Sequence, residues 1–212
     1  MPIVTNRNAD HCSERAVDEY LNRFVYKKLY DKFQPISDAK QQLAGIDVIV
    51  NNDMYIDNKA MTDPQYLNNP ANSFILEIAS FNHGAYQLGW FLNDNLKTTH
   101  YMFVWLPEVN VPSGSRLVDS RQIQKIEIML VDRNEVHKLI NSYISDEGLK
   151  ERAKKVVRRN LKEDFIVCSP LKICHSIHKA ESPVTLRVPK SLYKTIAIKH
   201  CYVTPTEIID IK

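Results

Sequence analysis

Apolar side chains recur at helical spacing near the start of the chain. They lie at positions 17, 20, 21, 24, 25 and 29, which predicts an amphipathic helix over residues 13–33. Ser13 is the expected N-cap of this helix. Glu14 lies three residues before Val17 and falls on the apolar face, whereas Glu19 points roughly the opposite way. One interpretation of Glu14 is that it stabilises the positive end of the helix.

Strand patterns dominate most of the remaining chain. The polar segment 51–53 separates two runs of β-branched and aromatic residues and predicts a hairpin loop. A short helix is expected over residues 84–92. A capping box at Asp132 and Glu135 predicts a further helix, which Gly148 is expected to separate from a second one. The predicted strands are residues 45–50, 55–60, 73–80, 99–106, 165–168, 171–177, 184–188, 195–202 and 208–211.

The length of the hairpin loop decides which side chains meet. If three residues form the loop, Val50 faces Met54 and, counting outward, Asp47 lies opposite Asp57. Opposed side chains share one face of a sheet with Cβ atoms about 5 Å apart. Lys59 returns to the same face because strand side chains alternate. A loop of two or four residues would instead send Asp47 to the other face.

The two acids stand in strands that are otherwise apolar. A buried carboxylate is usually paired, hydrogen-bonded or bound to a metal, because burying it alone is costly. Two carboxylates and a lysine on one face suit phosphodiester hydrolysis, since hard oxygen ligands hold Mg²⁺ or Mn²⁺, which activates water and offsets phosphate charge. Lys59 would orient or deprotonate the attacking water, or stabilise the developing negative charge. The alternative is a surface hairpin whose acids pair with nearby lysines.

Asp47 followed by Asp57-Asn58-Lys59 resembles the signature of the PD-(D/E)XK, or restriction-endonuclease-like, nuclease superfamily: an acid on one strand and acid-x-Lys on the next. The resemblance covers about residues 10–105. It implies that Asp47 and Asp57 bind the metal, that the Asn58 carbonyl completes the coordination, and that Lys59 positions the water. Two departures are Asp57, where glutamate is commoner, and Gly45-Ile46, where the name-giving proline would stand.

Two further acids are candidates for the same site. Many superfamily members carry a glutamate on the first helix that reaches the metal, and Glu14 resembles it. Glu77 lies among the apolar residues of the predicted strand 73–80 and is a second-tier ligand candidate. Alternatively, Glu77-Ile78-Ala79 is the true acid element, but then the lysine is missing and the chemistry is weaker.

Composition bounds the remaining possibilities. With 212 residues, 44% hydrophobic and 25% charged, the chain is large enough for one domain with a full core, or for a domain plus a small appendage. The resemblance implies a nuclease-like core over residues 1–130, with C-terminal helices and short strands over 131–212 packed on the same domain. No apolar run long enough for a membrane span and no signal-peptide pattern appears, so we expect a cytoplasmic protein without a membrane partner. Gly-rich phosphate loops are absent, which disfavours kinases and dinucleotide-binding enzymes. The residues Cys174, His175, His178, His200 and Cys201 form a possible zinc set whose spacing matches no finger, and ordinary core cysteines and surface histidines are the preferred interpretation.

Positive charge gathers between residues 150 and 162, where seven basic residues accompany one acid. On a helix, positions 150, 154, 158 and 162 form one ridge beside an apolar side. Such a ridge can contact phosphates without reading sequence, and a solvated helix face is the alternative. The predicted nucleic-acid contacts are Lys150, Lys154, Lys155, Arg158 and Lys162.

Together these patterns predict an α/β protein with a mixed central sheet flanked by helices. The expected activity is Mg²⁺-dependent endonucleolytic hydrolysis of nucleic acid, with DNA as the favoured substrate and a restriction, repair or mobile-element role. A homodimer is plausible by analogy. The main alternative is a non-catalytic nucleic-acid-binding or assembly protein that retains the nuclease fold.

Overall fold

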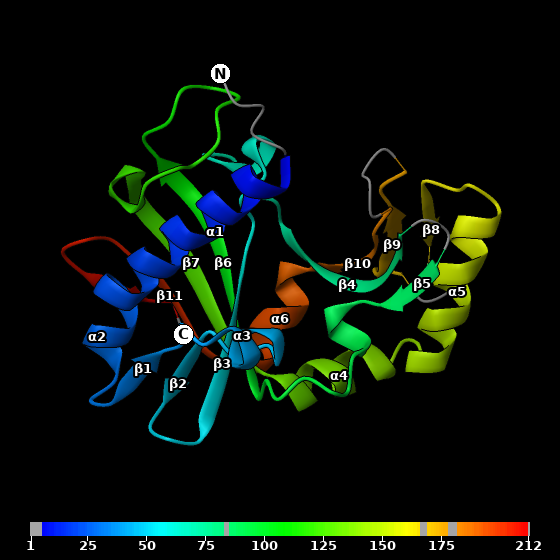
Figure 1. The fold of residues 1–212 in the computed structure, drawn as a ribbon, viewed down its shortest axis with the longest axis horizontal. Helices are drawn as coiled ribbons and strands as arrows, with labels where there is room; N and C mark the ends of the chain where they lie inside the picture. Colours follow the sequence, from blue (N-terminus) through cyan, green and yellow to red (C-terminus); the bar gives the residue numbers. More distant parts are fainter. Residues whose placement is uncertain (1–5, 83–84, 166–168, 178–181, 212) are drawn as a thin grey trace. The chain divides into compact units, whose positions relative to one another are not determined.

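The computed structural model describes residues 6–82, 85–165, 169–177 and 182–211 (Figure 1). The chain forms two compact units that are interleaved in the sequence. Unit 1 comprises residues 1–71, 98–132 and 197–212, and unit 2 comprises residues 72–97 and 133–196. The chain therefore passes between the units four times, and only the third passage lies near the boundary expected at residue 130.

Unit 1 is built on a seven-stranded mixed sheet. Its strand order is β1-β2-β3-β6-β7-β11-β12. The neighbours β3 and β6 run parallel, and every other neighbouring pair is antiparallel. The α/β class with a mixed central sheet is thus confirmed. The strands are β1 Phe33–Pro35, β2 Val48–Val50, β3 Met54–Ala60, β6 His100–Val109, β7 Ile123–Asp132, β11 Ala197–Val203 and β12 Ile208–Asp210.

A long helical segment covers one face of this sheet. It runs through α1 (Asn6–Leu21), a π-helical turn η1 (Asn22–Tyr26) and α2 (Lys27–Leu29), and Figure 1 shows α1 lying across β6 and β7. Its apolar face buries against the sheet. This core includes Val17, Tyr20, Leu21 and Val25 from the helix and Val48, Ile56, Met102, Val104, Ile128 and Val203 from the strands.

The predicted first helix is present, but its start was wrong. The helix already begins at Asn6, so Ser13 lies inside it and is not its N-cap. Ser13 is buried and its hydroxyl donates to the carbonyl of Leu117 at 2.6 Å, which satisfies a serine within a helix. Glu14 consequently lies beyond the first turn, so its proposed role at the positive helix end is also wrong.

The predicted hairpin is confirmed, including its three-residue loop. Val50 pairs with Met54 and Val48 with Ile56. Asn51 and Asn52 adopt positive φ angles of 51° and 72°, a conformation that asparagine tolerates better than most residues. The remaining helical elements of unit 1 are α3 Ala39–Leu43, η2 Pro64–Tyr66 and η4 Ser120–Gln122.

Unit 2 contains an antiparallel five-stranded sheet of order β5-β4-β10-β9-β8. The buried residues Leu149, Ala153 and Val156 lie on one side of α5, as its apolar pattern predicts. Its strands are β4 Ser73–Asn82, β5 Ala85–Leu88, β8 Glu163–Phe165, β9 Lys172–His175 and β10 Val184–Pro189, and its helices are η3 Trp90–Leu92, α4 Arg133–Asn141, α5 Asp146–Arg158 and α6 Lys190–Ile196.

Two predictions for unit 2 were wrong. The expected helix over residues 84–92 is instead strand β5, which pairs with β4, followed by the short η3. Gly89 lets the chain approach β4, since a Cβ there would lie 2.3 Å from the carbonyl oxygen of Glu77. Gly148 does not separate two helices, because it lies in the first turn of α5 and donates its N–H to the capping hydroxyl of Ser145 at 3.1 Å.

The predicted C-terminal strands are present with different bounds. Residues 190–196 form helix α6, so the strand expected from residue 195 begins only at Ala197. Residues 166–168 of the first of these strands lie outside the described residues. None of the helices within the described ranges is long and apolar enough to cross a membrane.

Candidate functional site

The hairpin of unit 1 brings the predicted acids together. Asp47 lies directly before β2, and extending the hairpin register by one pair places it opposite Asp57. Asp57 is only 3% exposed, and its Oδ1 lies 2.8 Å from the Nζ of Lys59. Asp57 and Lys59 are neighbours of the fully buried Tyr101 and Phe103 on the parallel strand β6. These aromatic neighbours help to keep the carboxylate out of water.

Asn58 connects the hairpin to the helical segment. Its backbone N–H donates to Asp47 Oδ2 at 2.8 Å. Its side-chain Oδ1 accepts a hydrogen bond from the Tyr26 hydroxyl at 2.5 Å, and its Nδ2 donates to Asp18 Oδ1 at 2.9 Å. The side chain of Asn58 therefore has a structural role that the sequence did not suggest, while the proposed coordination by its carbonyl stays a prediction.

Asp18, and not Glu14, is the helix acid that contacts the hairpin. The side chain of Glu14 is 58% exposed and lies 3.3 Å from His11. Asp18 is one turn further along the helix and bonds Asn58. The sequence could have predicted Asp18, because it follows Glu14 by four residues and residues four apart share a helix face. As predicted, Glu19 points elsewhere, since it accepts from the hydroxyl of Ser120.

Asp18, Asp47 and Asp57 are defined as the acidic site. The neighbouring positive groups do not fully compensate the negative charge of these carboxylates. Burial raises the pKa of Asp57 to about 7; Lys59 opposes this effect and Asp47 adds to it. Burial, and next the charge of Asp47, raise the pKa of Asp18 to about 7 as well. Both carboxyls therefore favour a proton, or another positive charge, near neutral pH.

Lys59 remains an ammonium beside these acids. Burial by itself would lower its pKa, but the charge and hydrogen bond of Asp57, together with Asp47 and Glu14, raise the pKa above its ordinary value. A protonated lysine can orient water and stabilise negative charge, but it is a poor proton acceptor. Of the roles considered for Lys59, the structure favours orientation and charge stabilisation.

The acidic site fits a hard divalent cation in its donor chemistry. One oxygen of each carboxylate is held by an N–H donor: Asp18 Oδ1 by Asn58, Asp47 Oδ2 by the Asn58 amide, and Asp57 Oδ1 by Lys59. The buried Asp57 Oδ2 accepts from no N–H or O–H group of the described residues. No set of three or more His, Cys, Asp or Glu side chains within those residues is arranged to hold a metal. The fit therefore rests on the Asp47–Asp57 pair, and Mg²⁺ is often bound by one or two carboxylates with waters.

The other metal-ligand candidates lie on other strands. Glu77 lies on β4, in the five-stranded sheet of unit 2. The strand pairing that would bring Cys174 and His175 toward His200 and Cys201 is not formed, because β9 and β11 belong to different sheets. His200 instead contacts Glu127 at 2.9 Å, and His178 lies outside the described residues.

The basic ridge, defined as Lys150, Lys154, Lys155, Arg158 and Lys162, lies in unit 2 and is partly neutralised. Lys150 and Lys154 pair with Glu147 and Glu151 one turn earlier, at 3.5 and 2.8 Å. Lys155 lies 3.6 Å from Asp164, while Arg158 and Lys162 are exposed. Unit 2 nevertheless carries 15 of the 28 Lys and Arg but only 9 of the 25 Asp and Glu, a net charge of +6 against −3 for unit 1.

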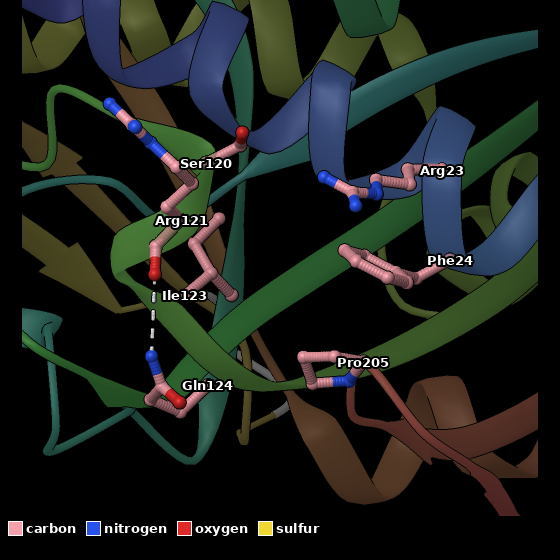
Figure 2. A pocket seen from close by; sticks show the side chains of 7 residues that line it. All are labelled: Arg23, Phe24, Ser120, Arg121, Ile123, Gln124 and Pro205. Atoms are coloured by element: carbon pink, nitrogen blue, oxygen red, sulfur yellow. Dashed lines mark hydrogen bonds between the residues drawn. The ribbon is translucent and has the colours of Figure 1, made fainter.

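A shallow pocket of about 220 Å³ in unit 1 was not predicted (Figure 2). The guanidinium of Arg23 lies over the ring of Phe24, 5.0 Å from its centroid. Arg121 is already bound to both oxygens of Asp119. None of the predicted site residues lines this pocket. Its lining residues are Arg23, Phe24, Ser120, Arg121, Ile123, Gln124 and Pro205.

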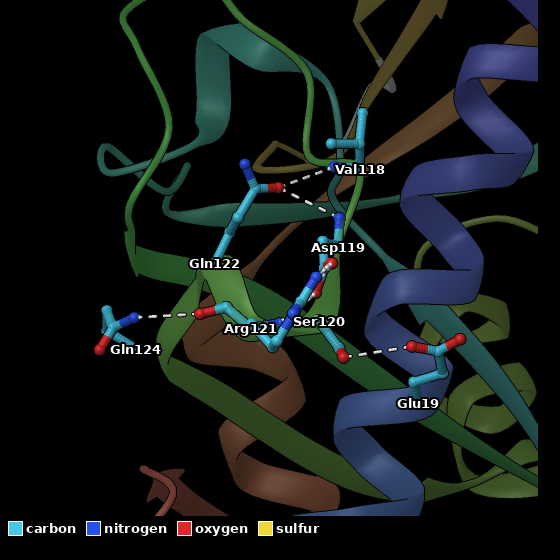
Figure 3. A network of polar contacts seen from close by, with 7 residues as sticks. All are labelled: Glu19, Val118, Asp119, Ser120, Arg121, Gln122 and Gln124. Carbon is cyan, nitrogen blue, oxygen red and sulfur yellow. Dashed lines mark hydrogen bonds and ion pairs between the residues drawn. The ribbon is translucent and has the colours of Figure 1, made fainter.

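The polar network beside this pocket serves the fold (Figure 3). Asp119 and Gln122 form a reciprocal capping box around η4. Ser120 then donates to Glu19 at 3.1 Å, which ties η4 to the exposed side of α1. Because these groups satisfy one another, we assign them a structural role.

Comparison with known proteins leaves the family open. No protein-family model matches the chain, and neither the curated proteins nor the solved structures give a match.

Proposed function

We propose that this chain is a divalent-metal-dependent endonuclease with a restriction-endonuclease-like core in unit 1, acting on nucleic acid and favouring DNA. The observation that carries the proposal is Asp57: a buried carboxylate with one oxygen on Lys59, the other without an N–H or O–H donor, and a second carboxylate, Asp47, beside it. Such an arrangement is costly unless a proton or a further cation joins it, and we propose the cation.

The roles of the residues follow from their positions. Asp47 and Asp57 would hold Mg²⁺ or Mn²⁺, with the Asn58 carbonyl as a further ligand. The bound metal would lower the pKa of a coordinated water and offset charge on the phosphate. Lys59 would orient this water and stabilise the negative charge that develops. Asp18, rather than Glu14, would be the acid that the first helix contributes to the metal site. Glu77 is not part of the proposed site.

Unit 2 is the proposed source of nucleic-acid affinity. Its net charge of +6 and the exposed Arg158 and Lys162 support phosphate contacts by the basic ridge. These contacts would position the duplex without reading its sequence. Cutting both strands would suit a homodimer, which rests on analogy alone.

A second candidate is a nucleic-acid-binding or assembly protein that retains this fold without chemistry. The observation in its favour is that the described residues offer no three-residue metal-ligand set. This candidate predicts binding of DNA that neither Mg²⁺ nor Mn²⁺ changes.

The deciding experiment is cleavage of supercoiled, linear and single-stranded DNA with Mg²⁺ or Mn²⁺. Wild type is compared with Asp57→Asn, Lys59→Ala and the control Asp53→Asn, which alters an exposed acid in the hairpin loop. Metal-dependent cutting that the first two variants lose and the control retains would support the endonuclease. No cutting by folded wild type that still binds DNA would support the second candidate.

A further inference from the structure

Tyr26, Asn58 and Asp18 form a hydrogen-bonded chain that the proposed chemistry does not use directly. Tyr26 is fully buried and donates to Asn58 Oδ1 at 2.5 Å, and Asn58 Nδ2 donates to Asp18 Oδ1 at 2.9 Å. The chain joins the helical segment to β3 within unit 1. It ends on a carboxylate whose nearest charged neighbours include Asp47 and Asp57.

The chemistry of these three side chains determines which group donates and which accepts in each hydrogen bond. Tyr26 is a phenol at neutral pH, and its hydroxyl donates a hydrogen bond to Asn58 Oδ1. A phenol donor selects the oxygen of the Asn58 amide. The amide nitrogen must then face Asp18, where it donates to one oxygen. The other oxygen of Asp18 is thereby given a defined orientation.

The π-helical turn explains how two residues eight apart reach the same asparagine. In a regular α-helix, about 100° of rotation per residue would separate positions 18 and 26 by about 80°. A π-helical turn spans five residues per hydrogen bond where an α-helix spans four, and so accommodates one more residue. The turn Asn22–Tyr26 lies between the two positions and removes most of that offset.

We propose that Tyr26 and Asn58 are positioning residues that hold the Asp18 carboxylate toward a divalent cation at Asp47 and Asp57. This inference rests on the proposed function, because it assumes that the acidic site takes a cation. Asp18 would contact the cation through a coordinated water, and the Asn58 amide would restrict its rotation. Outer partners of this kind typically change metal affinity 10–100-fold when they are removed.

The test is calorimetric titration of the full chain with Mn²⁺. The proteins are wild type, Tyr26→Phe, Asp18→Asn and the double variant. Tyr30→Phe serves as the control, because Tyr30 directly follows α2 and its ring contacts Tyr26, with 6.2 Å between ring centroids. Tyr26→Phe should weaken Mn²⁺ binding about 10–100-fold. The double variant should bind no more weakly than Asp18→Asn, since the tyrosine acts through the aspartate. Tyr30→Phe should match wild type.

The outcomes separate this inference from the proposed function. If wild type binds Mn²⁺ and Tyr26→Phe binds it equally well, or if the two losses add in the double variant, the positioning role is wrong and the endonuclease proposal survives. If folded wild type binds no Mn²⁺, both proposals are wrong. If Tyr26→Phe does not fold, Asn58→Leu replaces it, because this change keeps the backbone amide and carbonyl and removes both side-chain hydrogen bonds.

Discussion

The acidic site of unit 1 and the basic ridge of unit 2 differ in how their charges are compensated. At the acidic site, like charges are buried together, and the pKa values of Asp18 and Asp57 rise to about 7. On the ridge, opposite charges alternate at the surface, and pairing lowers the pKa of Glu151 and raises that of Lys154. Three ridge lysines are paired with acids, whereas two carboxyls of the acidic site favour a proton or another positive charge near neutral pH. Under the proposed function, this difference would separate the site of chemistry from a surface that attracts a polyanion.

Neutralising one carboxylate should have the largest effect. We expect Asp47→Asn to reduce Mn²⁺-dependent DNA cleavage at least about 100-fold, more than the loss of an outer partner would. The reason is that Asp47 contributes both a ligand and the charge that attracts the cation. Initial cleavage rates of wild type and Asp47→Asn at saturating DNA measure this loss. Asp53→Asn is the control, and equal losses in both variants would contradict a specific role for Asp47.

The metal-free protein should lose stability as pH rises. Asp57 keeps its proton in the folded protein up to a pKa of about 7, but releases it near 3.8 when unfolded. Folding therefore binds a proton between these values, and stability is greatest below about pH 4 for this group and falls until about pH 7. A shift of this size corresponds to roughly 4 kcal/mol.

Urea unfolding in chelator at pH 5 and pH 8 measures this difference. Asp57→Asn should reduce the dependence on pH without removing it, because the amide does not titrate whereas Asp18, whose pKa is also raised to about 7, still does. A wild type whose stability is equal at both pH values would argue against a buried, strained carboxylate.

Mn²⁺ should restore part of the stability lost at pH 8. A ligand at 100 times its Kd stabilises the folded state by about 2.7 kcal/mol. Thermal unfolding at pH 8 with and without Mn²⁺ detects this as a higher Tm for wild type. The increase should vanish in Asp57→Asn and persist in Lys154→Ala, since only the acidic site takes the cation. An increase of equal size in Asp57→Asn would place the cation elsewhere.

Changes to the ridge should be the smallest. Lys154→Ala and Arg158→Ala should each lower the dependence of DNA affinity on salt by about one counterion and leave the cleavage rate at saturating DNA unchanged. Stability should change by less than about 1 kcal/mol, because exposed ion pairs contribute little. Fluorescence anisotropy at several salt concentrations measures the slope. Lys138→Ala on α4 is the matched control, since Lys138 forms a similar pair with Glu135 at 2.7 Å.

The sequence predicted the hairpin well because its information is local. Two asparagines that tolerate positive φ and flanking β-branched residues determine both loop length and register. The same holds for α5, where Leu149, Ala153 and Val156 follow helical spacing. Ser13 was misassigned because a serine hydroxyl can bond a distant carbonyl as well as cap a helix, and only the fold reveals Leu117 beside it.

The features that the sequence did not predict depend on contacts between residues distant in sequence. Residues 85–88 form a strand because β4 offers its edge. Asp18 belongs to the acidic site because Asn58 meets it across 40 positions, and a π-helical turn sets the phase of Tyr26. No Gly- or Ser-rich linker marks the boundaries between the interleaved units. At residues 132 and 196 one element follows the other without a loop, and at residues 71 and 97 the connecting segments are short.

The interleaving has a consequence for how the protein is made. The central strands β3, β6 and β11 come from three separate passages of the chain, so the sheet cannot be completed until β11, at residues 197–203, has left the ribosome. Pairings so distant in sequence must overcome loop-closure entropy first, which slows folding. A nascent chain released near residue 130 would leave one edge of β7 without its partner strand and prone to aggregation. We therefore expect this protein to depend on chaperones during synthesis.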